Sequence, residues 1–275
     1  MKTEEIIIKT EAYYAIQSLR IQAQLRIKAF VRDKRLDKKE AKKLHHWNDD
    51  LLKNMENGIK KEMEILIKDI PIFKKFFKKI KGIGPCLAGS LYAGIYDISR
   101  FITISKLWKY CGQDVQNGEA PRREKGKKIT WNPFLRMTMH KISDSFIKQD
   151  PKKSQYRRLY DEFKLYYQIK FPQWGICWHC KGQMKTNETG IGMKCVKCDK
   201  DQAGEPHPTR KTKKGKPIYR YTKNHIHNMA KRKVAKIFLQ HMFVKWWELD
   251  HGKTPSEPWI LVHGGHVDYI ECEEA

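Results

Sequence analysis

The first 70 residues contain no proline and only one glycine, Gly58. Proline and glycine disfavour a helix interior more than other residues, so their scarcity predicts almost continuous helix over this stretch. A set of apolar residues recurs there at steps of three or four positions: Leu44, Trp47, Leu51, Met55, Ile59, Met63, Leu66 and Ile70. This spacing predicts one continuous apolar face on a long helix.

Two different partners would cover that face. The first is an earlier helix of the same chain, over about residues 5–33, in an antiparallel hairpin. The second is another copy of the chain in a coiled coil. The sequence leaves both arrangements open.

Pro71 ends the long helix, because proline cannot continue the hydrogen-bond ladder and restricts the residue before it. Apolar residues and lysines then alternate in a pattern that predicts a short amphipathic helix, with one side formed by Ile72, Phe73, Phe76, Phe77 and Ile80. Residues 82–85 follow and read Gly-Ile-Gly-Pro. Glycine adopts backbone angles closed to other residues and proline suits a first helical turn, so a second helix is expected over Leu87–Ile95.

A helix, a Gly-Ile-Gly turn and a second helix form the pattern of a helix-hairpin-helix. Such a turn presents backbone N–H groups at a helix N-terminus, where they can hold a phosphate oxygen. The alternative is a tight corner between two helices that binds nothing. We expect the turn and the lysines beside it to contact nucleic acid: Lys78, Lys79, Lys81, Gly82, Ile83 and Gly84.

The net charge favours binding. Lysine and arginine number 56 against 31 acidic residues, a formal charge of +25. Such an excess indicates a polyanionic partner, most commonly nucleic acid. A membrane surface is the rival, but no apolar run approaches the roughly 20 residues that span a bilayer. The segment MKTEEIIIKTEAYY has acidic residues and a three-residue apolar core, so we expect no signal peptide and an intracellular protein of the cytoplasm or nucleoid.

Four of the seven cysteines form two Cys-x-x-Cys pairs: Cys177 and Cys180, then Cys195 and Cys198. Each pair can direct two thiolates at one ion, and this spacing is typical of a tetrahedral zinc site in a small zinc ribbon. Four thiolates fill the coordination shell, so the expected Zn²⁺ is structural. A redox pair, disulfides and an iron–sulfur cluster are the alternatives.

Two basic segments are further candidates for nucleic-acid contact. One is the loop with Arg122, Arg123, Lys125, Lys127 and Lys128. The other follows the cysteines and includes Lys211, Lys213, Lys214 and Lys216, with tyrosines close by. A solvated basic linker is the alternative for the second segment. The sequence does not separate DNA from RNA.

Three pieces of the chain share a pattern with one known family. The first, residues 80–113, carries Gly82, Gly84, Ala88, Asp97, Arg100, Phe101 and Gly112; the second carries Leu135 and Arg136; the third carries Ala230 and Arg232. In this order they resemble the C-terminal domain of transposases of the 110/116/902 insertion-sequence family. The resemblance covers about residues 50–250, interrupted by the cysteine segment. It implies a DNA-binding helix-hairpin-helix protein of a mobile genetic element that serves DNA recombination.

Two departures from the family bear on catalysis. The family has an N-terminal ribonuclease-H-like domain with four acidic metal ligands, whereas no strands with spaced acidic residues precede residue 40 here. The family also carries a Ser-Gly pair where this chain has Asn117 and Gly118. An amide cannot act as an oxygen nucleophile. Other serines could act instead, although no spacing singles one out: Ser99, Ser105, Ser143 and Ser145.

The sequence thus predicts a mainly α protein with four parts. They are a helical hairpin or coiled coil (1–70), a helix-hairpin-helix core (71–170), a zinc ribbon with a basic linker (171–223), and a C-terminal helix and tail (224–275). The predicted function is nucleic-acid binding, with DNA favoured over RNA, by a chain that lacks its own catalytic centre. One alternative is an active transposase or nuclease that completes its site with a partner chain. Another is a scaffold whose coiled coil recruits a transposase.

Overall fold

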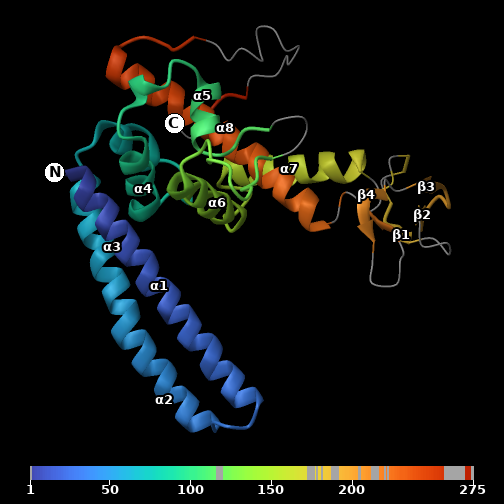
Figure 1. The fold of residues 1–275 in the computed structure, drawn as a ribbon, viewed down its shortest axis with the longest axis horizontal. Helices are drawn as coiled ribbons and strands as arrows, with labels where there is room; N and C mark the ends of the chain where they lie inside the picture. Colours follow the sequence, from blue (N-terminus) through green and yellow to red (C-terminus); the bar gives the residue numbers. More distant parts are fainter. Residues whose placement is uncertain are drawn as a thin grey trace.

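The computed structural model describes most of the chain. The described residues are 2–115, 120–171, 177, 179–180, 182–186, 192–203, 206–211, 217–219, 221, 223–256 and 270–273. Within them, eight α-helices dominate and five short strands lie between the last two helices, so the predicted mainly α class is confirmed (Figure 1). No helix in these ranges is long and apolar enough to cross a membrane.

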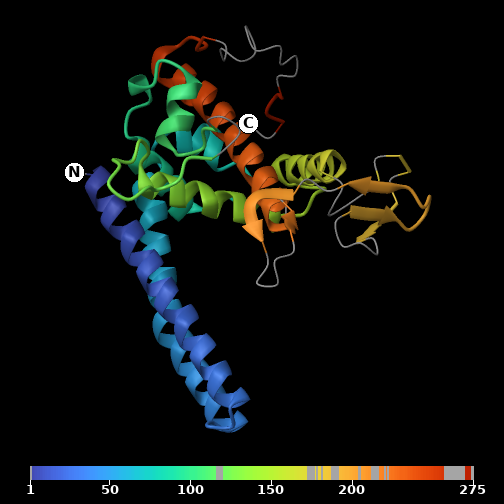
Figure 2. The same ribbon diagram turned by 45° about the vertical axis from the view of Figure 1, so that its right-hand side comes forward.

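The N-terminal helices form an antiparallel hairpin that projects from the rest of the molecule (Figures 1 and 2). Helix α1 (Lys2–Arg32) packs along α2 (Lys38–Asn48) and α3 (Asn54–Ile67), which a π-helical turn at Asp49–Lys53 connects. The side chain of Asp37 starts α2 by accepting hydrogen bonds from the backbone N–H groups of Lys39 and Glu40. An intrachain hairpin is one of the two arrangements that the sequence leaves open.

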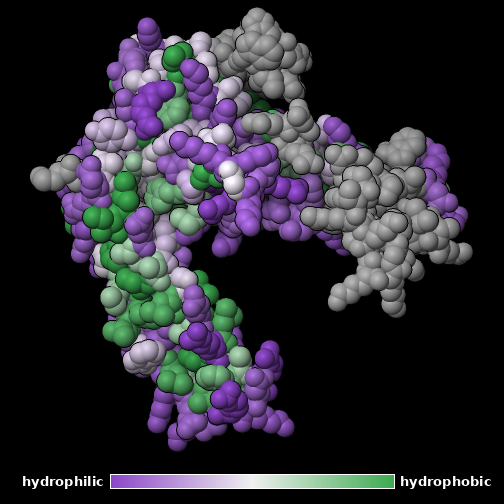
Figure 3. All heavy atoms as spheres, viewed as in Figure 1, coloured by the Kyte–Doolittle hydropathy of each residue, from purple (hydrophilic) through white to green (hydrophobic). Residues whose placement is uncertain are grey.

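Polar contacts join the two arms of this hairpin. Arg20 pairs with Glu56, Gln24 Nε2 donates to Asp49 Oδ1 (3.1 Å), and Asn48 Nδ2 donates to the Arg20 carbonyl (3.3 Å). The hairpin leaves the first half of the expected apolar face exposed. Four of its residues are 40–55% exposed: Leu44, Trp47, Leu51 and Met55. Figure 3 shows hydrophobic residues on the surface of this arm.

The core follows the hairpin. Its elements are a π-helical turn (Phe73–Phe77), α4 (Pro85–Ile95), a 3-10 turn (Ile98–Arg100), α5 (Ile104–Tyr110), α6 (Pro133–Ile147), α7 (Gln155–Lys170) and α8 (Lys223–His251). Phe238 of α8 lies at the aromatic centre, with its ring centroid 5.9 Å from that of Phe76, 5.3 Å from Phe146 and 5.5 Å from Tyr156. All four side chains are fully buried, so this cluster fixes α6, α7 and α8 around the segment before α4.

The short strands form a small unit inserted between α7 and α8. Strands β1 (Met184–Thr186), β2 (Gly192–Cys195) and β3 (Asp201–Ala203) make an antiparallel sheet in the order β1-β2-β3. Strands β4 (Pro206–Lys211) and β5 (Pro217–Tyr219) pair in a separate antiparallel ladder. At the base of the insertion, the ring of Phe171 stacks on that of Tyr221 with 3.7 Å between centroids.

Candidate functional site

The Gly-Ile-Gly-Pro sequence forms the turn that leads into α4, here called the α4 turn (residues 82–85). Gly82 has φ +94°, a conformation that favours glycine. A side chain at this position would also approach Ser145 Oγ to 3.1 Å. Ser145 Oγ donates a hydrogen bond to the Gly82 carbonyl (2.6 Å), and this contact with α6 stabilises the turn.

Gly84 differs from Gly82, and the expectation that both glycines need special backbone angles is wrong for this one. Its φ of −89° and ψ of 173° are extended values that any residue adopts. A Cβ atom built on Gly84 meets no atom of the described chain within 4 Å. Gly84 therefore faces open space, where a side chain would obstruct close approach of a ligand.

The start of α4 has the properties of an anion site. No side chain caps this helix, and Pro85 occupies its first turn. The first N–H groups of a helix have no partner within it, and the helix dipole places partial positive charge there. Lys78, Lys79 and Lys81 are exposed beside the turn, whereas the Ile83 side chain is buried in the core and can offer only its backbone.

A cavity of about 340 Å³ opens next to the α4 turn. Its wall is formed by α1, α3, α4 and α6 through Tyr13, Tyr14, Gln17, Lys60, Gly84, Pro85, Cys86, Leu87, Lys141, Asp144, Ser145 and Lys148. We call it the lysine pocket after Lys60, Lys141 and Lys148. None of these three lysines forms an ion pair with a carboxylate of the described residues. Sequence reasoning missed all three, because nothing in the spacing of α3 and α6 shows that they meet at α4.

Lys141 is the most perturbed of these lysines. Its Nζ lies over the ring of Tyr14, and burial lowers its pKa to about 8. Burial also raises the pKa of the neighbouring Cys86 thiol to about 11, so this thiol is neutral at physiological pH. Three lysines and one carboxylate, Asp144, therefore line the pocket.

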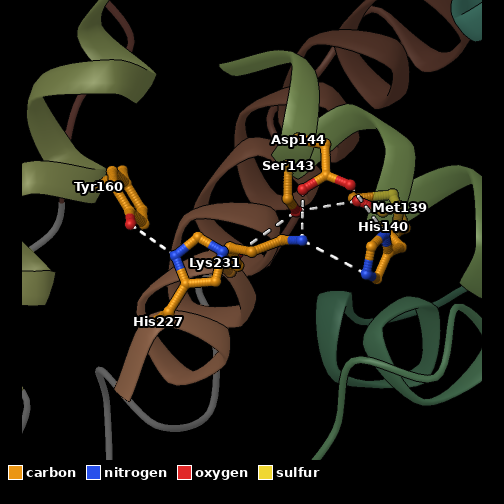
Figure 4. Close-up of polar contacts among 7 residues, drawn as sticks. All are labelled: Met139, His140, Ser143, Asp144, Tyr160, His227 and Lys231. Atoms are coloured by element: carbon orange, nitrogen blue, oxygen red, sulfur yellow. Dashed lines mark hydrogen bonds and ion pairs between the residues drawn. The ribbon is translucent and has the colours of Figure 1, made fainter. Parts of the chain in front are cut away.

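A polar cluster that includes Asp144 of the pocket wall joins α6 to α8 (Figure 4). Lys231 is buried, and its Nζ donates to Asp144 Oδ1 (2.5 Å) and lies 3.3 Å from His140 Nε2. His140 Nδ1 is 3.1 Å from the other oxygen of Asp144. Partial burial opposes ionisation of Asp144, but the hydrogen bond and charge of Lys231 outweigh it and lower the pKa of the carboxyl group. Asp144 is therefore paired with Lys231. With three lysines against this one carboxylate, the lysine pocket keeps a net positive charge.

The structure does not bring the candidate serines together. Ser143 is buried and donates to the Met139 carbonyl (2.9 Å), while Ser145 holds the Gly82 carbonyl. Ser99 Oγ lies 3.0 Å from Nε2 of His251 at the C-terminal end of α8. That end is about 30 Å along the helix from Lys231. Asn117 and Gly118, which stand in place of the family's Ser-Gly, lie outside the described residues.

The other basic segments are only partly described. In the loop after residue 120, all five predicted residues are exposed: Arg122, Arg123, Lys125, Lys127 and Lys128. Lys127 pairs with Glu124 (2.6 Å). Lys211 ends strand β4, and Lys213, Lys214 and Lys216 lie outside the described residues. Their contact with nucleic acid stays a prediction.

The four predicted cysteines converge. Their sulfur atoms all lie within 4.8 Å of one another, with 3.7 Å between Cys177 and Cys198 and 3.4 Å between Cys180 and Cys195. These separations are too long for disulfides, whose S–S bond is about 2.05 Å. Four thiolates at about 2.3 Å from a tetrahedral Zn²⁺ would be about 3.8 Å apart, so the set fits zinc.

Backbone geometry supports this cluster. Strand pairing places Met184 opposite Cys195, and Cys177 N–H donates to the Gly182 carbonyl (2.8 Å). A Cβ atom on Gly182 would lie 3.2 Å from the sulfur atoms of Cys180 and Cys195 and 2.9 Å from Cβ of Lys197. Glycine is therefore required there by the closeness of the thiolates. The cluster is the one candidate metal site found within the described residues.

Residues 74–158 match the model of the Transposase IS116/IS110/IS902 family. This segment begins just before the α4 turn and ends in α7, so it contains the turn, α4, α5 and α6. The match is to the C-terminal, helix-hairpin-helix part of the family, and the four-cysteine cluster follows it. No curated protein and no solved structure matches the chain.

Proposed function

We propose that this chain, which carries a transposase-family domain at residues 74–158, binds nucleic acid, and DNA in particular, through the α4 turn and the lysine pocket. The uncapped start of α4 beside the lysine pocket, whose wall holds Lys60, Lys141 and Lys148 against one carboxylate, carries the proposal. Backbone N–H groups at a helix N-terminus bind phosphate oxygens, and each neutralised phosphate releases counterions. A phosphate in this position would also compensate the half-buried charge of Lys141.

Two further observations support DNA as the partner. The matched family consists of transposases, whose substrate is DNA. The formal charge of +25 supplies a wide electrostatic field that attracts any polyanion. The proposed contact set also includes the loop at residues 122–128 and the basic segment after the cysteines.

The four-cysteine cluster has a structural role in this proposal. It holds one Zn²⁺, because four thiolates match the ligand preference and the tetrahedral spacing of that ion. A closed four-sulfur shell leaves no position for substrate or water, so the ion stabilises the inserted unit and does not take part in chemistry. Binding without strand cleavage is the proposed activity, and Asn117, which stands where the family carries a serine, supports it.

Gly84→Val tests the proposal directly. Because this position is extended and faces open space, valine should leave the melting temperature unchanged. It should weaken binding to every duplex sequence alike, since a phosphate contact carries no base information. Gly58→Val is the matched control, because Gly58 also faces open space but lies on α3 outside the residues that line the lysine pocket. Thermal unfolding gives the melting temperature, and a gel-shift titration with a magnesium cleavage readout gives the affinity and any cleavage.

Lysine substitutions give the second arm of the test. Replacing Lys79 and Lys81 by alanine should reduce the slope of log affinity against log salt by about one unit for each phosphate that is no longer neutralised. Unchanged affinity in Gly84→Val together with an unchanged salt slope in the lysine variant would leave the turn as a corner between helices. Metal-dependent cleavage by the purified chain, abolished by one serine or aspartate substitution, would favour the recombinase alternative.

The exposed apolar residues of the arm favour a second role, pairing with another copy of the chain. The hairpin buries other residues of these helices, such as Leu52 and Asn48, so the face formed by Leu44, Trp47, Leu51 and Met55 stays uncovered within the described molecule. Apolar residues at this helical spacing pair efficiently in a coiled coil. Trp47→Glu combined with Leu51→Glu should convert a dimer to a monomer in sedimentation equilibrium. A wild-type monomer at high concentration would exclude this pairing.

A further inference from the structure

Three cationic side chains from two helices lie near the C-terminal end of α5, and we call them the Gly112 cluster: Arg136, Arg232 and Lys236. Arg232 NH1 donates to the Gly112 carbonyl (3.1 Å). Gly112 has φ +64°, and a Cβ atom there would lie 2.9 Å from Cδ of Arg136. Both arginines therefore pack against the same glycine, one from α6 and one from α8.

Lys236 completes the cluster one helical turn after Arg232. Its Nζ lies 4.1 Å from the ring centroid of Trp108, whose Nε1 donates to the Lys236 carbonyl (3.0 Å). The guanidinium of Arg136 lies 4.6 Å from the ring centroid of Trp131. Each cation thus rests on a neutral group, either an aromatic face or a carbonyl.

Positive charge in the cluster exceeds the negative charge near it. Asp114 is the carboxylate that acts on Arg232 and Lys236, and Lys233 adds another cation from α8. None of the three cluster residues forms an ion pair with a carboxylate in the described ranges of the chain. Burial, followed by the charges of Lys233 and Arg232, lowers the pKa of Lys236 to about 8. Burial and then Arg136 lower the pKa of Arg232.

This arrangement is unfavourable for the isolated protein. Like charges held close together in a partly buried setting disfavour each other's ionised form. Removing water from a charge without pairing it also costs free energy. An anion between the three groups would reverse both effects, and two arginine forks match the oxygens of a phosphate group.

We propose that the Gly112 cluster binds a phosphodiester group of nucleic acid, as a second phosphate site distinct from the α4 turn. The inference rests on the proposed function, because nucleic acid supplies the phosphate. Arg136 and Ser145, which braces the α4 turn, are nine positions apart on α6, or about 14 Å along the helix. Nine positions are about two and a half helical turns, so the two residues lie on opposite faces of α6 and the Gly112 cluster is a contact separate from the α4 turn.

The first experiment uses Lys236→Met, which keeps the stem on Trp108 and removes the charge. Affinity for a 20-base-pair duplex should fall about tenfold, while the melting temperature stays the same or rises because like-charge repulsion is relieved. Lys245→Met is the matched control on the same helix; Lys245 lies within ion-pair distance of Glu248 (3.9 Å), and its removal should leave both properties nearly unchanged. A lower melting temperature with unchanged affinity would show that the cluster only caps α5, and would overturn the proposal.

The second measurement needs no variant. The Lys236 ammonium group is titrated by NMR in the wild-type protein, alone, with the duplex and with inorganic phosphate. The duplex should raise its pKa by about one unit or more, at a concentration far below that of inorganic phosphate. A response to inorganic phosphate alone would define a small-anion site and would refute the nucleic-acid assignment. No response to a duplex that demonstrably binds would refute the site altogether.

The same titration in the Gly84→Val variant separates this inference from the proposed function. If the α4 turn fails as a site but the Gly112 cluster holds, Gly84→Val binds normally and Lys236 still responds to the duplex. If the α4 turn binds phosphate but the Gly112 cluster does not, Gly84→Val weakens binding and the pKa of Lys236 in the wild type does not change when the duplex is added. The two proposals can therefore be rejected independently.

Discussion

The α4 turn and the cysteine cluster are both compact backbone turns, but different forces hold them. The turn lies on a core of fully buried aromatic side chains, and α6 fixes it through the hydrogen bond from Ser145 to Gly82. In the cysteine unit, the buried side chains that the structure describes are Cys177, Met193 and Cys195. Apolar burial gives the first region its shape, whereas the second has few buried side chains and a cluster of four cysteines that could hold a metal ion.

This difference predicts how each region responds to change. Apolar burial contributes through many small contacts, so the turn should tolerate removal of any single surface charge. Coordination concentrates the stabilisation of a small unit in one ion, so the cysteine unit should lose order in a single step. The two regions should therefore unfold independently.

Removal of the metal is the largest expected effect. A structural zinc contributes on the order of 10 kcal/mol or more to the folding of a small unit. Cys195→Ser should abolish bound zinc, and EDTA should expose the segment between Phe171 and Tyr221 to proteases. The thermal transition of the helical core should stay in place. Mass-spectrometric metal analysis and limited proteolysis measure the two outcomes, and Cys86→Ser, outside the cluster, is the control that should keep its zinc. A core transition that shifts together with zinc loss would contradict independence.

Phe238→Ala is the reciprocal change in the core. Truncation of this fully buried ring, which contacts Phe76, Phe146 and Tyr156, should cost about 3–5 kcal/mol of unfolding free energy. Zinc content should remain one ion per chain, because the cysteine cluster shares none of these contacts. Urea unfolding followed by circular dichroism gives the free energy. Loss of zinc at urea concentrations where the wild type retains it would show that the core and the inserted unit are coupled.

Local sequence patterns predict both regions, because each depends on residues close together in the chain. Gly-Ile-Gly-Pro specifies a turn and a helix start, and two Cys-x-x-Cys pairs specify a four-sulfur cluster. The pattern of one helix does not reveal what its partner offers. Spacing alone predicts a continuous face from Leu44 to Ile70, but contacts of Arg20 and Gln24 on α1 set the register and leave its first half exposed.

The same limit applies to the binding residues. Lys60 and Lys141 line one pocket although about 80 positions separate them, and Arg136 meets Arg232 only through the packing of α6 against α8. Such clusters form when helices pack, and their residues carry no joint signal in the sequence. The positive φ of Gly82, in contrast to the extended Gly84, accompanies a hydrogen bond from a distant serine.

The two glycines of the turn provide a smaller and more local test. Gly82→Ala should destabilise the fold by about 1–3 kcal/mol, because alanine disfavours φ +94° and crowds Ser145 Oγ. Gly84→Ala is the matched control two positions on, and its unfolding free energy should change by less than about 0.5 kcal/mol. Equal losses in the two variants would mean that the turn is not held by Ser145 in the way described.

The smallest expected effect is a pH dependence that belongs to the turn and not to the cysteine unit. Lys141 has a folded-state pKa of about 8, lowered by burial from its usual value of 10.5. Between these two values the unfolded chain binds more protons at this position, so its contribution makes stability rise with pH. Its contribution to anion binding runs the other way, because the ammonium charge is lost as pH rises through about 8.

Affinity for duplex DNA should therefore fall by a few-fold between pH 7 and pH 9, and part of that fall should be absent in Lys141→Met. The groups facing Lys141 do not reproduce this behaviour: burial holds the Cys86 thiol neutral with a pKa of about 11 and raises the pKa of Tyr14, while Asp144 stays ionised beside Lys231. The pKa of Lys236 is also about 8. The affinity of the wild type is therefore compared with that of Lys141→Met at each pH, because Lys236 contributes equally to the pH dependence of both proteins. Gel-shift titrations at constant ionic strength supply the four affinities. If the ratio of the two affinities is the same at pH 7 and pH 9, Lys141 does not contact the bound phosphate, and the lysine pocket must be assigned to Lys60 and Lys148 alone.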